Sequence, residues 1–153
     1  MSVLKNKRGE QKLEVLMKAK DLMEYILIIT QNDKTFKPVY QALTTDIIQC
    51  AERIYTYLYT ANEIYRNSSN LELRQSYQTK ASAECNVLLA LMDLSQRLNH
   101  FSSSRIQTVN RLISDVEENG IKKKGLKTLI NNWKASDIRE LYKQSDNKES
   151  AMN

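Results

Sequence analysis

Glycine, proline, histidine and cysteine are scarce in this chain, and each scarcity excludes a class of protein. The 153 residues include three glycines and one proline, fewer than a many-stranded sheet needs at its turns. The single histidine, His100, and two cysteines without CxxC spacing, Cys50 and Cys85, form no metal-ligand set. Both cysteines fall in apolar helical patterns, so we expect small buried side chains in a reducing cytoplasm. No metal or cofactor is predicted.

Long apolar segments are also missing from the sequence. The longest, Tyr25 to Ile29, is far too short to span a bilayer. The first residues, MSVLKNKRGEQK, are polar and lack the apolar centre of a signal peptide. The sequence therefore predicts a cytoplasmic protein with no membrane partner.

Recognisable catalytic motifs are absent as well. The sequence has no Gly-rich phosphate loop, no nucleophile elbow and no zinc-ligand spacing. A carboxylate-bridged di-iron bundle would need inward-facing Glu-x-x-His pairs, which one histidine in a predicted loop cannot supply. His100 itself is expected at the C-terminal end of a helix. We predict a binding protein, not an enzyme.

What the chain has instead is helical periodicity, with apolar residues spaced three and four apart in four stretches. The first stretch carries Val15, Ala19, Leu22, Ile26 and Ile29. The second, from about Pro38 to Asn67, carries Leu43, Ile47, Cys50, Ile54, Leu58 and Ala61. The third carries Leu73, Tyr77, Ala81, Val87, Leu91, Leu94 and Leu98, with Leu88 and Met92 beside that line. The fourth carries Ile106, Val109, Ile113 and Val116, and resumes after Gly120 through Leu126, Leu129, Ile130 and Trp133.

Short connections between long helices favour antiparallel neighbours. The predicted fold is therefore all-α: an up-down antiparallel four-helix bundle whose fourth helix is long or kinked near Gly120. Residues 1–10 are predicted to be a basic N-terminal arm, 11–135 the four-helix bundle, and 136–153 a polar C-terminal tail.

Four of the eight tyrosines of the chain lie in one part of the second stretch, IYTYLYTANEIYR at 54–66. If Ile47, Ile54 and Leu58 face the core, Tyr55 and Tyr59 lie to one side of them. Three interpretations of these rings stay open: the boundary of the core with hydroxyls in water, a subunit interface, or a platform for stacking bases.

Positive charge is concentrated near the two ends of the chain, and the net charge is +5. In an up-down bundle the first and last helices bring these two segments together, which favours binding to phosphates without sequence readout. A solvated, solubilising charge run is the alternative. The predicted nucleic-acid-binding residues are Lys5, Lys7, Arg8, Lys12, Lys122, Lys123, Lys124, Lys127 and Lys134.

The order of several short motifs resembles one known family. A basic-aromatic turn, DKTFKP, precedes a helix that closes on the Ala61–Asn62 pair of YTANEIYR. ECNVLLALMDLS lies in the third helix, and the last helix ends on the tryptophan of LINNWKAS. Over roughly residues 12–136 this order is similar to the four-helix-bundle proteins related to the accessory variability determinant (Avd) of diversity-generating retroelements. The same superfamily includes proteins encoded by intervening sequences of bacterial 23S ribosomal RNA genes.

The resemblance implies a non-catalytic accessory protein that forms a homopentameric ring, binds RNA or DNA, and partners a reverse transcriptase. Such a ring needs each protomer to expose apolar surface, which favours the subunit-interface interpretation of the tyrosines. The predicted interface residues are Tyr40, Ile48, Tyr55 and Tyr59. The competing hypothesis is an oligomeric structural or protein-interaction bundle that does not bind nucleic acid.

Overall fold

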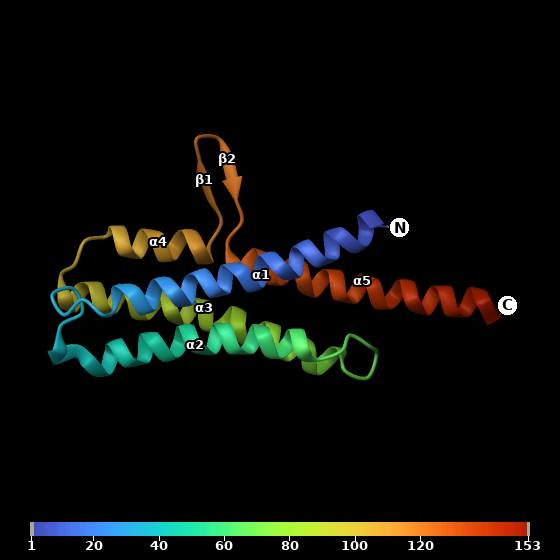
Figure 1. Cartoon of the computed structure of the whole chain (residues 1–153), viewed down its shortest axis with the longest axis horizontal. Coiled ribbons are helices and arrows are strands. Elements are labelled where there is room, and N and C mark those ends of the chain that lie inside the picture. The colour runs from blue at the N-terminus through green and yellow to red at the C-terminus, as the bar shows by residue number, and fades with distance from the viewer. Residues whose placement is uncertain (1, 153) are drawn as a thin grey trace.

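A computed structural model of the chain shows a mostly helical protein with one small hairpin (Figure 1). It describes residues 2–152, and the side chains of residues 11–144, 146 and 147. The helices are α1 (Ser2–Ile29), a short 3-10 helix η1 (Pro38–Tyr40), α2 (Gln41–Glu63), α3 (Leu71–Asn99), α4 (Ser104–Ile113) and α5 (Leu126–Met152). The strands are β1 (Val116–Glu118) and β2 (Ile121–Lys123).

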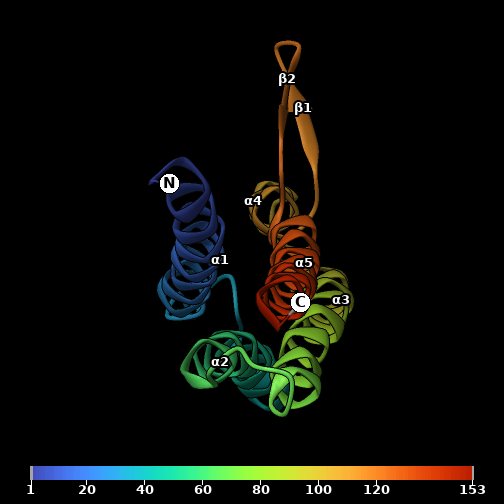
Figure 2. The ribbon, with the colours of Figure 1, turned by 90° about the vertical axis from the view of Figure 1, so that its right-hand side faces the viewer.

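The long helices lie side by side, and the chain reverses direction between α1 and α2, between α2 and α3, and between α3 and α4 (Figure 1). Viewed end on, α1 and α5 lie side by side, α2 and α3 lie below them, and α4 lies on the hairpin side of α5 (Figure 2). Helix α2 contacts α1 and α3, while α5 contacts α1 and α3 from the other side. No helix within residues 2–152 is long and apolar enough to cross a bilayer.

The predicted core positions of α1 and α2 are confirmed almost throughout. Val15, Leu22 and Ile26 on α1 are completely buried, and so are Ile54 and Leu58 on α2. Their spacing places them on one side of each helix, where they pack against the other helices. In these two helices the apolar period alone identifies the inward side.

On α3 the predicted apolar line is not the buried one. The buried side chains are Arg74, Gln78, Ala81, Cys85, Leu88, Met92, Ser95 and Asn99. Val87 and Leu94 are 44% and 46% exposed, whereas Leu88 and Met92 beside them are fully buried. The buried residues follow an unbroken heptad spacing, but half of them are polar or charged, which conceals that spacing from a search for apolar periodicity.

A β-hairpin lies between α4 and α5. The expectation of a single fourth helix that is long or kinked near Gly120 was therefore wrong. Strand β1 pairs with β2 in antiparallel fashion, with Glu118 opposite Ile121. The two residues between them, Asn119 and Gly120, have φ values of 53° and 77°. Positive φ at both positions is the requirement of the tight hairpin turn that Asn-Gly favours. The dipeptide is therefore a hairpin turn, and the hairpin projects away from the helices (Figure 1).

Asp115 joins the base of the hairpin to the start of α5. Its carboxylate accepts hydrogen bonds from the backbone N–H of Gly125 at 2.8 Å and from the Thr128 hydroxyl at 2.9 Å. The Gly125 hydrogen bond is the main cause of a lowered pKa for Asp115. A carboxylate at the first turn of a helix satisfies N–H groups that the helix itself leaves unpaired.

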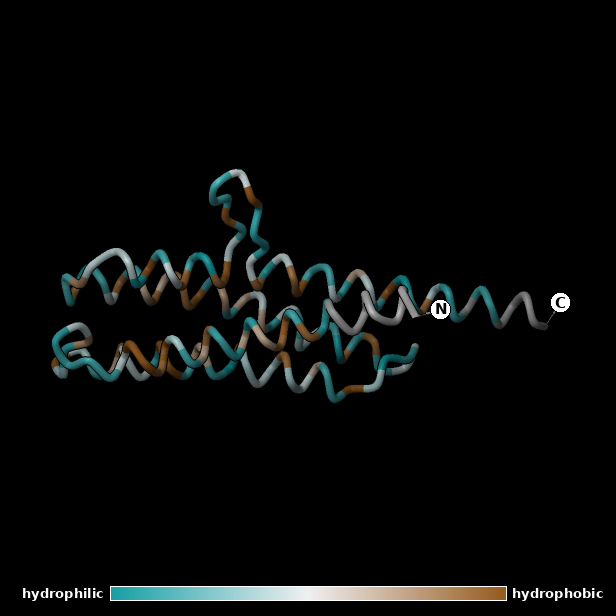
Figure 3. The backbone as a smooth tube through the Cα atoms, turned by 45° about the horizontal axis from the view of Figure 1, so that its top comes forward, coloured by the Kyte–Doolittle hydropathy of each residue, from teal (hydrophilic) through white to brown (hydrophobic). Residues whose placement is uncertain are grey.

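Two segments near the ends of the chain extend the helices further than the sequence indicates. Helix α1 begins at Ser2, within the predicted basic arm, and α5 continues to Met152 through the predicted polar tail. The far part of α5 runs past the other helices (Figure 1), and its described residues Lys143 and Gln144 are exposed and hydrophilic, as the teal of the tube there shows (Figure 3). Ser136 and Asp137, at the start of the predicted tail, are 6% and 1% exposed and belong to the buried interior.

Gly125 supplies a first test of this arrangement. A Cβ at position 125 would collide with the backbone carbonyl of Ile113. Gly125→Ala should therefore lower the free energy of unfolding by about 1–3 kcal/mol, since a rigid backbone cannot yield to it. Gly120→Asn is the comparison, because a Cβ at position 120 would meet nothing within 4 Å, so its only cost is the strain of φ +77°, which Asn bears better than most residues with a side chain. Equal urea midpoints for the two variants would contradict the close approach.

Candidate nucleic-acid interface and a buried polar cluster

The lysines of the hairpin lie beside helix α1. Lys122 and Lys123 belong to β2, Lys124 follows it, and all three are exposed. The Lys18 ammonium donates a hydrogen bond to the Lys124 carbonyl at 3.2 Å. A groove of about 550 Å³ separates this part of α1 from the hairpin. We call Lys18, Lys122, Lys123 and Lys124 the α1–hairpin surface.

Acidic residues moderate the positive charge of this surface. Glu14 and Asp21 line the same groove from α1. Glu118 of β1 forms ion pairs with Arg111 of α4 at 3.0 Å and with Lys123 of β2 at 3.6 Å. Exposed pairs of this kind contribute little to stability. Their effect here is to leave Lys122 and Lys124 as the hairpin lysines without a described ion pair.

The remaining predicted lysines do not join this surface. On α5, Lys134 donates a hydrogen bond to the Thr79 hydroxyl of α3 at 2.7 Å. Lys127 does not line the groove; its ammonium opposes the rise by which burial brings the pKa of the Cys85 thiol to about 12. Lys12 lines a separate cavity, described below. The side chains of Lys5, Lys7 and Arg8 lie outside the described residues.

The predicted interface residues Tyr40, Ile48, Tyr55 and Tyr59 are all half-buried. The rings of Tyr55 and Tyr59 touch, with centroids 4.7 Å apart. Burial, with a side-chain hydrogen bond between Tyr59 and Tyr55, raises the pKa of Tyr59. Ile48, Tyr55 and Tyr59 pack against the core of their own chain. Part of their apolar area is therefore covered already, and their role between subunits stays a prediction.

A more exposed apolar face lies on α3, where the sequence predicts core. It consists of Val87, Leu91, Leu94 and Leu98, which we call the α3 stripe. Leu94 is 46% and Leu98 36% exposed, and Leu91 is half-buried. The spacing of four, three and four places these side chains on one side of the helix.

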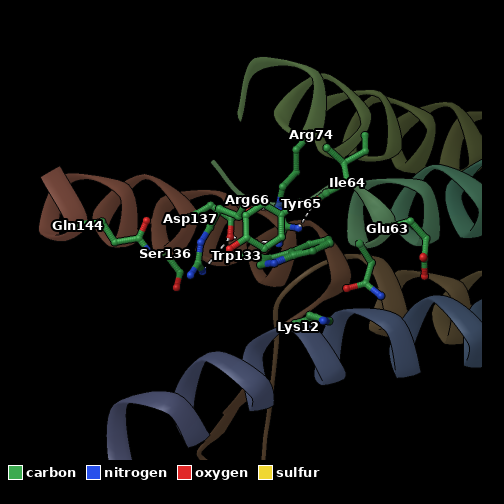
Figure 4. Close-up of a pocket in the computed structure, with 11 residues that line it drawn as sticks. Lys12, Glu63, Ile64, Tyr65, Arg66, Arg74, Trp133, Ser136, Asp137 and Gln144 are labelled. Atoms are coloured by element: carbon green, nitrogen blue, oxygen red, sulfur yellow. Dashed lines mark hydrogen bonds and ion pairs between the residues drawn. The ribbon is translucent and has the colours of Figure 1, made fainter. Parts of the chain in front are cut away.

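A group of buried polar side chains joins α3 to α5, and the sequence patterns do not predict it. Arg74 of α3 donates to both carboxylate oxygens of Asp137 on α5, at 2.7 and 3.2 Å. The exposed fractions of the two side chains are 8% and 2%. Gln78 donates to the same carboxylate at 3.0 Å, and the Arg74 guanidinium lies 4.9 Å from the centroid of the Trp133 ring. We call Arg74, Gln78, Trp133 and Asp137 the Arg74–Asp137 cluster (Figure 4).

This cluster also fixes the chain where α2 ends. Another nitrogen of the Arg74 guanidinium donates to the carbonyls of Ala61, at 3.2 Å, and Ile64, at 2.9 Å. Carbonyl groups at the end of a helix have no partner within the helix, so an external donor stabilises them. Arg74 therefore contacts two of the quoted sequence motifs, YTANEIYR through these carbonyls and LINNWKAS through Trp133.

A cavity of about 480 Å³ opens beside the cluster, and we call it the Arg66 cavity (Figure 4). Its walls come from α1, from the end of α2 and the turn after it, from α3, and from α5. It is lined by Lys12, Asn62, Glu63, Ile64, Tyr65, Arg66, Arg74, Trp133, Ser136, Asp137 and Gln144. Arg66 lies 3.8 Å from Asp137 as an ion pair, too far for a hydrogen bond.

Sequence patterns offered little warning of this site. Arg74 and Asp137 are 63 positions apart, and Asp137 falls in the segment predicted to be a polar tail. The available signals were Trp133, the only tryptophan, and Arg74 with Gln78 in the heptad register of Ala81, Cys85 and Leu88.

The cysteines are buried, as predicted, and are poor nucleophiles. Burial and a hydrogen bond to Glu84 raise the pKa of Cys50 to about 12. The Glu84 carboxylate accepts the thiol at 3.1 Å and pairs with Arg53 at 3.1 Å. Partial burial raises the pKa of Glu84, but these hydrogen bonds outweigh it and the net pKa is lowered. Within the described side chains no three His, Cys, Asp or Glu residues are grouped as metal ligands.

Comparison of the chain with protein-family models, with curated proteins and with solved structures gives no match. The resemblance to the Avd-related bundles therefore stays a prediction. The chemistry of the site has to be argued from its own residues.

The Arg74–Asp137 pair supplies a second test. Asp137→Asn leaves a buried guanidinium without its counter-charge, so the free energy of unfolding should fall by about 3 kcal/mol or more. Asp93→Asn is the matched control, because its pair with Arg97 is exposed by 56% and 76% and contributes about 0.5 kcal/mol or less. Urea denaturation followed by circular dichroism measures both. A cost for Asp137→Asn as small as that of the control would show that the pair does not hold α3 to α5.

Proposed function

We propose that this chain is a non-catalytic protein that binds RNA or DNA through the α1–hairpin surface. The observation that carries the proposal is the projection of Lys122, Lys123 and Lys124 on a hairpin, beside Lys18 of α1 (Figure 1). Lysine side chains of this kind neutralise phosphates and release counterions, which gives affinity that falls with salt. A two-stranded ribbon is also narrow enough to enter the major groove of B-DNA.

Lysines position a protein on a phosphate backbone but do not choose a base sequence. The hairpin tip, Asn119–Gly120, offers one amide side chain and no aromatic ring. We therefore propose a surface that recognises shape and charge, with sequence preference supplied elsewhere in an assembly.

The resemblance extends this proposal to an accessory protein of a reverse transcriptase in a diversity-generating retroelement. It also suggests an up-down four-helix bundle in which α4 and α5 share the fourth position. The alternation of helix direction in Figure 1 supports that topology. The hairpin between α4 and α5 is then an insertion that carries the lysines outward.

Reversing the three hairpin charges tests the proposal. Lys122→Glu, Lys123→Glu and Lys124→Glu together should greatly weaken binding to a structured RNA and lower the salt slope of the remaining affinity by about 2–3, one for each lost phosphate contact. The slope is measured by fluorescence anisotropy at several salt concentrations, with helical content followed by circular dichroism.

The matched control reverses three exposed charges at the end of the molecule where α1 turns into α2 and α3 ends. Lys34→Glu, Lys37→Glu and Arg97→Glu change the net charge equally and lie away from the hairpin (Figure 1). Binding by the control but not by the hairpin variant supports the proposed surface. Equal binding by both variants would contradict the proposed surface. Equal loss of binding in both variants would also contradict it, because binding would then depend on the net charge of the chain and not on the hairpin lysines.

The second candidate function, an oligomeric protein-interaction bundle without nucleic-acid binding, is favoured by the α3 stripe. Four apolar side chains in heptad spacing suit packing against a helix of a second copy. The spacing of four, three and four is the same in both directions, so an antiparallel pair of α3 helices would bring Leu91 opposite Leu94 of the other copy. Such a twofold contact is self-complementary.

Light scattering tests this second function. Leu94→Glu with Leu98→Glu should convert an oligomer into monomers, because two charges would have to be buried at the contact. Ile28→Glu is the control, since Ile28 is an exposed apolar residue on α1, at 68%. A wild-type chain that is monomeric at high concentration would contradict the oligomer, and a variant that stays oligomeric would exclude the α3 stripe as its interface.

A further inference from the structure

We propose that the Arg66 cavity binds a small organic phosphate of nucleotide size. The cavity is separate from the α1–hairpin surface, and none of its lining residues belongs to that surface. The proposal therefore goes beyond the proposed function and does not depend on it. It follows from the charges, the free donors and the dimensions of the cavity.

The charges around the cavity leave a positive excess. Asp137 is fully engaged by the bidentate contact with Arg74, so these two charges neutralise each other. Arg66 and Lys12 then remain as two cations on the lining, against the single carboxylate of Glu63. Glu63 is exposed, and Figure 4 shows it at the side of the cavity away from Arg66. An anion entering between the turn and α5 would therefore meet Arg66 without a nearby unpaired carboxylate.

The hydrogen-bond donors of these two cations are free. Among the described residues, Arg66 makes its 3.8 Å ion pair with Asp137 and no hydrogen bond. Its Nε is buried without a partner, and so is the Oδ1 atom of Asn62. Lys12, on the α1 wall, has neither a hydrogen bond nor an ion pair within the described part of the chain. Buried polar groups are nearly always satisfied, so the orphaned Nε of Arg66 calls for an acceptor such as a phosphate oxygen, and the orphaned Oδ1 of Asn62 calls for a donor such as a hydroxyl of the organic part.

A planar guanidinium with free N–H groups matches the oxygens of a phosphate better than any neutral group does. With the Lys12 ammonium it can balance the two negative charges of a phosphate monoester. A carboxylate carries one charge and would leave one cation unpaired. The chemistry of the lining thus favours a phosphate monoester.

The dimensions favour an organic ligand over inorganic phosphate. Ligand sites have volumes of about 300–1,000 Å³, and the 480 Å³ of this cavity lie within that range and far above one phosphate group. Tyr65 lines the cavity with a ring that is 75% exposed, so one aromatic face is open to a planar group. The Trp133 ring is unavailable for stacking because it is 2% exposed and lies under Arg74. Asn62 and Ser136 add polar contacts along the walls.

The frame of the cavity is held before any ligand arrives. Arg74 fixes the chain between Ala61 and Ile64 through two carbonyls, and the same guanidinium fixes α5 through Asp137. The segment that presents Asn62, Tyr65 and Arg66 is thus anchored to two helices. Binding at a site held in this way loses less entropy than binding that has to order a loop.

Trp133 provides the probe, because it lines the cavity and is the only tryptophan of the chain. The purified full-length chain is titrated with AMP to about 10 mM, a range that detects even millimolar binding, with tryptophan fluorescence and thermal unfolding as readouts. Adenosine, inorganic phosphate and succinate are titrated in parallel at equal ionic strength. We expect a saturable change with AMP, weaker binding of inorganic phosphate, and none with adenosine or succinate.

Each other outcome overturns a stated part of the proposal. No saturable change with AMP or inorganic phosphate would overturn the site itself. Binding of adenosine as tight as that of AMP would overturn phosphate recognition, and binding of succinate as tight as AMP would overturn the preference for phosphate over carboxylate. If inorganic phosphate bound as tightly as AMP, the proposed preference for an organic phosphate over inorganic phosphate would be overturned.

Variants locate the binding in the cavity. Arg66→Gln should weaken AMP binding by roughly 10- to 100-fold, the usual effect of losing a charged hydrogen bond. Arg97→Gln, an exposed arginine on α3 that pairs with Asp93, is the control and should bind AMP as wild type does. Lys12→Gln, at an exposed position, should weaken AMP binding while the fold is kept, so it tests the site even if Arg66→Gln unfolds. Unchanged affinity in Lys12→Gln and in a folded Arg66→Gln would overturn the proposal.

The same variants separate this proposal from the proposed function. The triple hairpin variant should bind AMP like the wild-type chain, because none of its positions lines the Arg66 cavity. AMP binding without nucleic-acid binding would leave the cavity proposal standing and remove the proposed function. Nucleic-acid binding without any change in Trp133 fluorescence on addition of AMP or inorganic phosphate would leave the proposed function standing and remove the cavity proposal.

Discussion

The buried ion pair between Arg74 and Asp137 is the constraint that holds α3, α5 and the end of α2 together. Charges that are 8% and 2% exposed are stable in a protein interior only when each is paired and hydrogen-bonded. Arg74 meets this requirement with contacts to α5 and to the end of α2, and Gln78 adds a third hydrogen bond to the carboxylate. Because the geometry has to be kept to satisfy the charges, the pair fixes where α2 ends and how α3 lies against α5.

The Arg66 cavity is a consequence of that geometry. The turn after α2 cannot close over α5 while Arg74 holds the carbonyls of Ala61 and Ile64, so a space remains between the turn, α1 and α5. Arg66 stands in this space next to a carboxylate that Arg74 already neutralises. The hairpin lysines, by contrast, lie at an exposed periphery where small acid–base pairs set the local charge. One chain thus carries a cavity lined by Arg66 beside a buried ion pair, and a group of exposed lysines on a hairpin.

Sequence reasoning succeeded where the core is apolar and failed where it is polar. The inward sides of α1 and α2 follow from periodicity because Val15, Ile26 and Leu58 have no polar competitor at their positions. On α3 the polar Gln78 and Ser95 occupy core positions, so apolar periodicity wrongly placed the exposed Leu94 in the core. The hairpin was missed although Asn119–Gly120 is a strong turn signal, since its flanking strands have three residues each. Such short strands carry almost no periodicity of their own.

The sequence by itself determined a helical protein with buried cysteines and lysines clustered near residue 122, because helix period, turn chemistry and charge are local properties. Only the tertiary structure decided that Arg74 meets Asp137, that Lys134 contacts α3 while Lys18 of α1 contacts the Lys124 carbonyl, and that Val87 faces outward. Each of these depends on the rotation of one helix against another. That rotation is chosen by the free energy of burying and pairing side chains far apart in the chain, which no local pattern records.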